Sequence, residues 1–307
     1  MKARRNVFAA CIYLVVVAAL PCQEKTGASE QVKLTATATT KGELKLSGLY
    51  SISFPFLQGS SFLTDGNNIK LSMGAELSPV SANTIAEIRL TPIAFLQFFT
   101  GASAGTGWNI PIADGLRKNN PAKDHEQELV GDAFDGVVWM GKGGSLFQFD
   151  TAAIVPGEWN HVVFQTTHVL WYRSLTSASS KESWLYEADQ GENRNGWNYY
   201  ANYFVGYKMP IKLNLAGILL EQELNLYTEA DRDLWGDDLS RWTVGAMANY
   251  AITDRLSLAT LVQWRTVRNF TDDTKDYGFY QDRRIQDSDQ RSFEFYRAVL
   301  TATWLIR

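Results

Sequence analysis

The sequence has few cysteines and histidines, and each scarcity narrows the possible functions. The 307 residues contain 2 Cys and 3 His. Cys11 lies in the apolar N-terminal segment, so a mature chain that has lost this segment cannot form an internal disulfide. No serine–histidine or aspartate–histidine pair can be recognised from the positions of the three histidines, so hydrolase chemistry has little support. We therefore expect no enzyme activity, no catalytic residues, no metal and no cofactor.

Long apolar runs are also missing after residue 22, where no stretch approaches the roughly 18 apolar residues of a membrane-spanning helix. Before it, Lys2, Arg4 and Arg5 precede an apolar core at 7–20 that is too short for a stable span, which is typical of a secretory signal peptide. We predict a signal peptide at 1–22 and a periplasmic lead-in at 23–42. Three fates remain open for Cys22: it could be lipidated, remain as a free thiol, or be removed with the signal peptide. The proline before it disfavours lipidation.

Positive charge is not in excess, because 29 basic residues stand against 33 acidic ones, for a net charge of -4. Cleavage of the signal peptide would remove three of the basic residues and make the chain more acidic. This balance excludes a generally basic nucleic-acid-binding protein, so no nucleic-acid partner is expected. The acidic cluster at 229–238 lacks calcium-loop spacing, and a solvated loop is favoured over a cation site.

What the sequence does have is strict alternation, clearest between Ser240 and Phe270. Every second residue from Trp242 to Ile252 is apolar or small, and the same holds from Leu256 to Trp264. A period of two predicts strands with one apolar face, and the intervening 253–255 predicts a tight hairpin. Soluble strands have about 5–6 residues, whereas a tilted membrane strand needs about 9–11.

Similar alternation predicts about ten strands, and the connections between them alternate between short and long. The other predicted strands are 43–54, 68–78, 84–101, 137–152, 159–173, 197–208, 212–227 and 292–306. Pro92 marks a bulge or strand end within 84–101, and a parity switch near Leu219 and Leu220 predicts a bulge. The long connection at 102–135 could fold inward and constrict the interior.

Aromatic residues reach 13%, with 10 Trp and 13 Tyr, as in proteins that use them at membrane interfaces. On this pattern, residues 43–306 resemble bacterial outer-membrane β-barrel proteins. The resemblance implies an all-β fold, a closed antiparallel transmembrane barrel of about ten strands (range 8–12), with short periplasmic turns and long extracellular loops. It also implies insertion into the lipid bilayer of the outer membrane by the barrel-assembly machinery. Such proteins usually end on an aromatic residue, whereas this chain ends on Arg307.

Parity assigns two sets of candidate site residues. The expected lumen-lining residues, which form either a structural charge network or a solute pathway, are Lys45, Lys70, Glu76, Glu87, Arg89, Asp150, Lys208, Glu221, Glu223, Arg265 and Arg297. The expected interfacial girdle is Trp171, Tyr172, Trp197, Tyr199, Trp242, Trp264 and Trp304.

Two functions fit this architecture. The first is a narrow porin-like channel for small solutes or ions, or a barrel with a purely structural lumen. The alternative is a surface-exposed adhesin or ligand-binding barrel whose long loops contact host surface molecules. A barrel of about eight strands is just filled by side chains, and 16–18 strands leave an aqueous channel, so about ten strands predict at best a narrow path.

Overall fold

The computed structural model describes residues 27–119, 129–130, 133–179, 182, 184–187, 193–226, 240–268 and 291–306. Within these ranges the only helix is a single 3-10 turn, η1 (Thr151–Ala153). No helix in the described part of the chain is long and apolar enough to cross a membrane. The strands are β1 (Ser29–Thr39), β2 (Leu44–Pro55), β3 (Asn68–Ser78), β4 (Ser81–Ile93), β5 (Leu96–Gly107), β6 (Leu116–Asn119), β7 (Leu129–Val130), β8 (Val138–Asp150), β9 (His161–Leu175), β10 (Trp184–Tyr186), β11 (Gly196–Lys208), β12 (Leu213–Asn225), β13 (Arg241–Ala251), β14 (Leu256–Arg268) and β15 (Arg291–Leu305).

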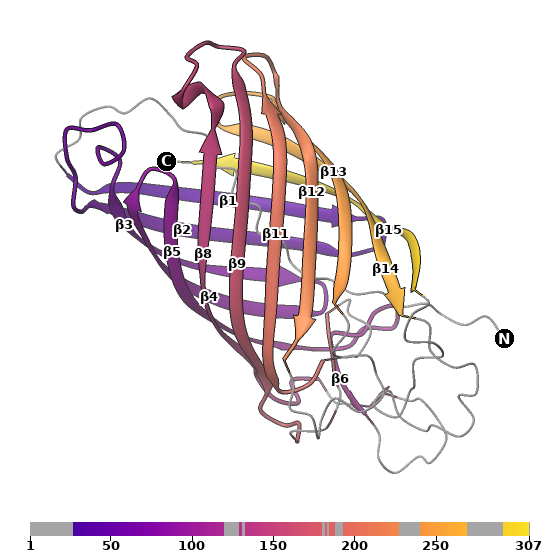
Figure 1. Cartoon of the computed structure of the whole chain (residues 1–307). Helices are drawn as coiled ribbons and strands as arrows, with labels where there is room; N and C mark the ends of the chain where they lie inside the picture. The colour runs from indigo at the N-terminus through magenta and orange to yellow at the C-terminus, as the bar shows by residue number, and fades with distance from the viewer. Residues whose placement is uncertain are drawn as a thin grey trace.

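Twelve of these strands form one closed antiparallel barrel in the order β1-β15-β14-β13-β12-β11-β9-β8-β5-β4-β3-β2 (Figure 1). The first and last strands close it, from Lys33 opposite Leu305 to Thr39 opposite Val299. We call the end where β1 begins and β15 ends the terminal end. The opposite end, where the connections at 108–137 and 176–195 join their strands, is the loop end.

The barrel therefore has 12 strands, and the prediction of about ten was low for two reasons. Residues 29–39, predicted to belong to a periplasmic lead-in, form β1 and pair with both β2 and β15. The predicted single strand at 84–101 is two strands, β4 and β5, joined by the two-residue turn Ala94–Phe95. Pro92 does lie at a strand end, and the register shifts between Leu90 and Ile93 as the chain reverses.

The two extra strands change which end of the barrel each connection occupies. With β1 included, the connection at 56–67 lies at the terminal end, together with 151–160, 209–212 and 252–255. The turn at 79–80 lies at the loop end instead. The sequence predicted that all long connections lie at one end of the barrel and all short ones at the other. This prediction is wrong for the connections at 56–67 and 79–80.

Bulges also differ from the prediction. The pairing of β12 with β11 runs without a break through Leu219 and Leu220, so no bulge lies there. The parity switch in the sequence arises because Leu215 and Leu219 point inward although they are apolar. A bulge does occur in β15, where Gln263 pairs with Arg297 and Trp264 with Phe295. Tyr296 is left between Phe295 and Arg297 and is 6% exposed.

The inward leucines belong to an apolar cluster on the wall of β11 to β14. It consists of Phe204, Leu215, Leu219, Met247 and the partly buried Leu261. Glycine makes room for it, because a Cβ on Gly217 would lie 2.7 Å from the ring of Phe204 and 2.5 Å from the carbonyl oxygen of Val205. The phenyl ring thus occupies the space that a larger residue on the neighbouring strand would need.

A small sheet of order β10-β6-β7 lies at the loop end, apart from the barrel sheet. It packs through Leu116, Trp184 and Tyr186 against Val138 and Leu175, which point inward from β8 and β9. Figure 1 shows β6 at this end of the barrel. The connections at 108–137 and 176–195 thus meet each other at the mouth of the barrel.

Candidate functional site

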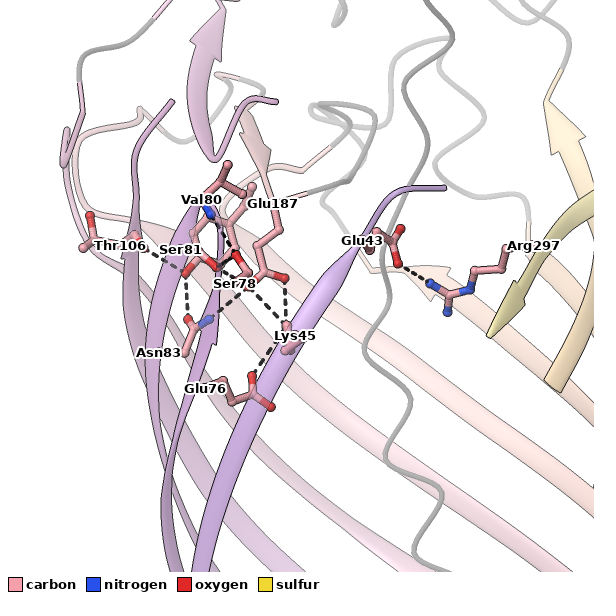
Figure 2. A network of polar contacts seen from close by, with 11 residues as sticks. Glu43, Lys45, Glu76, Ser78, Val80, Ser81, Asn83, Thr106, Glu187 and Arg297 are labelled. Carbon is pink, nitrogen blue, oxygen red and sulfur yellow. Dashed lines mark hydrogen bonds and ion pairs between the residues drawn. The ribbon is translucent and has the colours of Figure 1, made fainter. Parts of the chain in front are cut away.

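The first group of inward polar residues joins the small sheet to the opposite wall at the loop end (Figure 2). Glu187, which follows β10, accepts hydrogen bonds from Lys45 Nζ at 2.9 and 3.2 Å. It also accepts from Ser81 Oγ at 2.8 Å and Asn83 Nδ2 at 3.0 Å. Glu76 lies 3.6 Å from the same lysine. One loop carboxylate therefore binds the inner face of β2 and β4.

Charge and backbone geometry both show how strongly Glu187 is held. Burial alone would raise the pKa of Glu187, but the ammonium group of Lys45 and the donated hydrogen bonds hold the pKa below its ordinary value. Its φ is 57°, a conformation that costs energy for a residue with a side chain. Its side chain is 11% exposed. The contacts around Glu187 therefore outweigh both the desolvation and the backbone cost.

The neighbouring aromatic residues hold the small sheet from its other side. The guanidinium of Arg173 lies 5.2 Å from the ring centre of Trp184 and 5.6 Å from that of Tyr186. The Tyr186 hydroxyl donates to Asn83 Oδ1 at 2.7 Å. Burial raises the pKa of Tyr186, so it remains a donor at ordinary pH. The small sheet is thus fixed to β9 on one side and to β4 on the other.

The second group follows the walls of β11, β12, β14 and β15. Glu221 accepts from the Tyr200 hydroxyl at 2.7 Å and from Gln263 Nε2 at 2.6 Å. Arg297 then donates to Gln263 Oε1 at 2.9 Å and to Glu43 Oε2 at 3.0 Å. Glu43 precedes β2, and burial raises its pKa although Arg297 opposes the shift. This chain of contacts connects four strands and one turn.

Beside it, Glu223 forms an ion pair with Arg265 at 2.6 Å and lies 3.6 Å from Arg241. The bulge in β15 contributes here, because Tyr296 turns inward between two cations. The guanidiniums of Arg265 and Arg297 lie 4.6 and 4.8 Å from its ring centre. The predicted inward residues Glu221, Glu223, Arg265 and Arg297 therefore share one region of the interior.

The third group centres on Glu87 in β4. Arg89 and Lys142 approach its carboxylate at 2.7 and 2.6 Å. Arg89 also donates to Gln97 Oε1 at 2.8 Å and lies 4.9 Å from the ring centre of Phe99. The side chains of Glu87, Arg89 and Lys142 are 21%, 15% and 23% exposed, so the interior is not closed to water at this point.

Of the other predicted lumen residues, Lys70 pairs in register with Arg89 of the third group. Lys70 contacts Gln31 Oε1 at 3.4 Å. Asp150 is at the rim of the terminal end, where it pairs with His161 Nδ1 at 2.8 Å. Lys208 ends β11 at the same rim and pairs in register with His161.

Several interior residues were missed by the sequence interpretation, namely Lys33, Lys142, Arg173, Glu187 and Arg241. Lys142 could have been found by extending parity through 137–152. Glu187 could not have been found in this way, because it lies in a connection whose sequence shows no alternation of polar and apolar residues. The acidic cluster predicted at 229–238 lies outside the described residues. Among the described residues, no group of three His, Cys, Asp or Glu side chains could hold a metal ion.

The predicted girdle residues lie on the outer face with one exception. Trp197, Trp264 and Trp304 are 49%, 38% and 52% exposed. Tyr172 packs edge-on against Trp197, with ring centres 5.4 Å apart. Tyr199 donates to or accepts from His168 at 2.7 Å on the same face, and Trp242 pairs with Gln222 near the loop end.

Trp171 does not lie on the outer face, and its assignment to the girdle is wrong. It pairs with Lys142, and the guanidinium of Arg173 lies 6.0 Å from its ring centre, so it shares the inner face with both cations. Adjacent residues of a strand point to opposite faces, so Trp171 and Tyr172 could not both have been in the girdle.

The decisive feature is that polarity is inverted relative to a soluble protein. Large apolar side chains on the outside remain exposed, among them Leu46 at 62%, Met73 at 67% and Ile218 at 54%. Charged residues inside are buried, such as Glu221 at 3% and Arg297 at 4%. A continuous apolar belt on a closed sheet is stable only in lipid, where closure leaves no unpaired edge. The chain is a membrane-spanning β-barrel.

Several solved structures are similar to this barrel. They include the KdgM porin (11% identity, TM-score 0.37, covering 89% of this chain and 98% of that one). The translocator domain of the autotransporter NalP from Neisseria meningitidis matches at 8% identity and TM-score 0.38, over 92% of this chain and 89% of that one. OmpT of Vibrio cholerae matches at 7% identity and TM-score 0.34, over 92% of this chain and 98% of that one. No family model and no curated protein matches the sequence.

Proposed function

We propose that this barrel is a narrow channel for small solutes, constricted at its loop end by the small sheet. The observation that carries the proposal is the continuous set of charged inner side chains, from Glu223 near the loop end to Lys70 near the terminal end. A purely structural interior could be filled with apolar side chains at lower desolvation cost. Twelve strands also give more room than the roughly eight that side chains can fill.

The constriction follows from the contacts of Glu187 and Arg173. The small sheet is bound to β2 and β4 through Glu187 and to β9 through Arg173, so it bridges part of the mouth. The inner residues of β12 to β15 on the other side, such as Glu223 and Arg265, are bound to one another and line the remaining passage. At the loop end, a solute would enter along this second wall.

The test is electrical recording from the purified full-length chain in planar lipid bilayers. We expect discrete openings of small unitary conductance, because part of the mouth is occupied. Folded protein that inserts without any openings would contradict the channel proposal and favour the alternative, a surface-binding barrel acting through its loops. Saturable binding of loop peptides to a surface ligand would then support that alternative.

The aromatic residues of the outer face fit two interfacial girdles. Trp139, Tyr172, Trp197 and Trp242 lie near the loop end, and Trp159, Tyr207 and Trp304 lie near the terminal end. The Tyr207 hydroxyl donates to the backbone oxygen of Trp159 at 2.6 Å, so the second set is interconnected. Such residues hold a barrel at a fixed depth, because their rings favour the headgroup region.

A further inference from the structure

The wall formed by β1, β3, β4 and β8 carries more positive than negative charge. Lys33, Lys70, Arg89 and Lys142 lie close enough to Glu87 to interact with it electrostatically, and Lys33, Lys70 and Arg89 also repel one another. We call these four cations together with Glu87 the cation cluster. Glu76 of β3 also acts on Lys142, whereas Glu87 is the carboxylate that acts on both Lys33 and Lys70.

The two lysines of the cation cluster are the least compensated. Glu87 is engaged by Arg89 and Lys142 at 2.7 and 2.6 Å. Within the described part of the chain, the one polar contact of Lys70 is the amide oxygen of Gln31 at 3.4 Å, which carries no charge. For Lys33 no carboxylate lies within 4.0 Å among the described residues. The excess charge is therefore available to an anion.

The opposite wall does not supply the missing negative charge. The strand order places β12 and β13 across the barrel from β3 and β4. In the half nearer the terminal end, that wall presents the apolar cluster of Phe204, Leu219 and Met247. The acidic residues of β12, Glu221 and Glu223, lie nearer the loop end and are bound by Gln263 and Arg265.

From this arrangement we infer that the cation cluster is an anion site that makes the channel select small anionic solutes. The inference rests on the proposed channel function and adds the charge class of the solute. Fixed Lys and Arg side chains along a pore lower the energy of a passing anion and raise that of a cation. The side chains of Glu87, Arg89 and Lys142 are 15–23% exposed, so water reaches the site.

The test is the reversal potential across a bilayer with a potassium chloride gradient. We expect the wild-type channel to favour chloride over potassium. The double variant Lys33→Gln and Lys70→Gln should lower the chloride-to-potassium permeability ratio by about threefold or more, because it removes two uncompensated cations. The matched control is Lys41→Gln with Lys212→Gln, which removes the same charge from exposed turns and should leave the ratio unchanged.

A second measurement separates the inference from the channel proposal. In detergent, sodium phosphate should raise the unfolding temperature of the wild type above its value in sodium chloride of equal ionic strength, and the double variant should lose this difference. A conducting channel that prefers potassium, or a ratio unaltered in the double variant, would overturn the inference and leave the channel proposal standing. Folded protein with phosphate stabilisation but no openings would retain the anion site and refute the channel. If folded protein shows neither channel openings nor stabilisation by phosphate, both the channel proposal and the anion site are refuted.

Discussion

Glu187 is the residue on which the constriction of the barrel depends. Its carboxylate accepts from three side chains on two barrel strands, and its side chain is 11% exposed. Replacement by alanine would leave the donors of Lys45, Ser81 and Asn83 without this acceptor. We expect Glu187→Ala to lower the free energy of unfolding in detergent by about 2–3 kcal/mol and to increase the unitary conductance.

The matched control for that variant is Glu182→Ala in the same connection. Among the described residues, the carboxylate of Glu182 accepts one hydrogen bond, from the backbone nitrogen of Ser179 at 3.1 Å in an exposed position. Its replacement should change neither stability nor conductance appreciably. Equal effects of the two variants would show that Glu187 does not hold the constriction in place.

Two glycines of the barrel wall provide a second comparison at the residue scale. A Cβ on Gly217 would lie 2.7 Å from the ring of Phe204 and from Gly206 Cα, whereas nothing lies within 4 Å of a Cβ on Gly141. We expect Gly217→Ala to cost about 1–3 kcal/mol of stability through overpacking. Gly141→Ala should be nearly neutral. Denaturant titration of the folded barrel in detergent measures both, and equal losses would argue against the packing of Phe204 over Gly217.

The interior residues also show how far parity can be followed from sequence. Lys45 and Glu87 could be assigned to the inner face because the alternation of their strands is uninterrupted around them. Tyr296 could not, because a bulge beside Gln263 moves it to the other face and nothing in the local sequence marks the bulge. The partners of Glu187 are more than 100 residues away in the chain, so no local pattern can indicate them.

At the scale of strands, β1 is the element that sequence reasoning misjudged and the structure needs for closure. Its alternation of Thr35, Ala36, Thr37 and Ala38 gives two faces of nearly equal hydrophobicity, so the period-two signal is weak. The turn Ala94–Phe95 was missed for a related reason, since it has none of the Gly, Asn or Asp residues that mark two-residue hairpins. The long strands with strong contrast between faces, such as β3, were predicted at their observed bounds.

A proline in β1 tests its role in closure. Thr35 pairs with Ser47 of β2 and Thr303 of β15, so Thr35→Pro removes a ladder donor from a strand that is paired on both sides. The cost should be about 3 kcal/mol or more, and we expect the chain not to reach the compact, heat-modifiable form on gel electrophoresis. Ser60→Pro, in the connection at 56–67, should fold normally. A folded Thr35→Pro barrel would show that β1 is dispensable and favour a barrel with fewer strands.

For the whole molecule, strand number decides which connections face the same side of the membrane. Antiparallel neighbours alternate in direction, so adding β1 and dividing 84–101 into β4 and β5 moves some links from one end of the barrel to the other. The connection at 56–67 moves to the terminal end, and the turn at 40–43 lies at the loop end. The overall architecture could be inferred from sequence, because alternation reports the two faces of each strand. The assignment of links to ends could not, because one error in strand number inverts it.

Cysteine labelling of intact cells distinguishes the two arrangements. In a variant without Cys11 and Cys22, we expect Lys41→Cys at the loop end to react with a membrane-impermeant maleimide, because long loops of such barrels face the outside. Ser60→Cys at the terminal end should react only after the outer membrane is permeabilised. A barrel of ten strands, with 55–67 among the extracellular loops and 23–42 in the periplasm, requires the opposite result at both positions. Because both sites are exposed, a lack of labelling at one of them reports the side of the membrane and not burial within the fold.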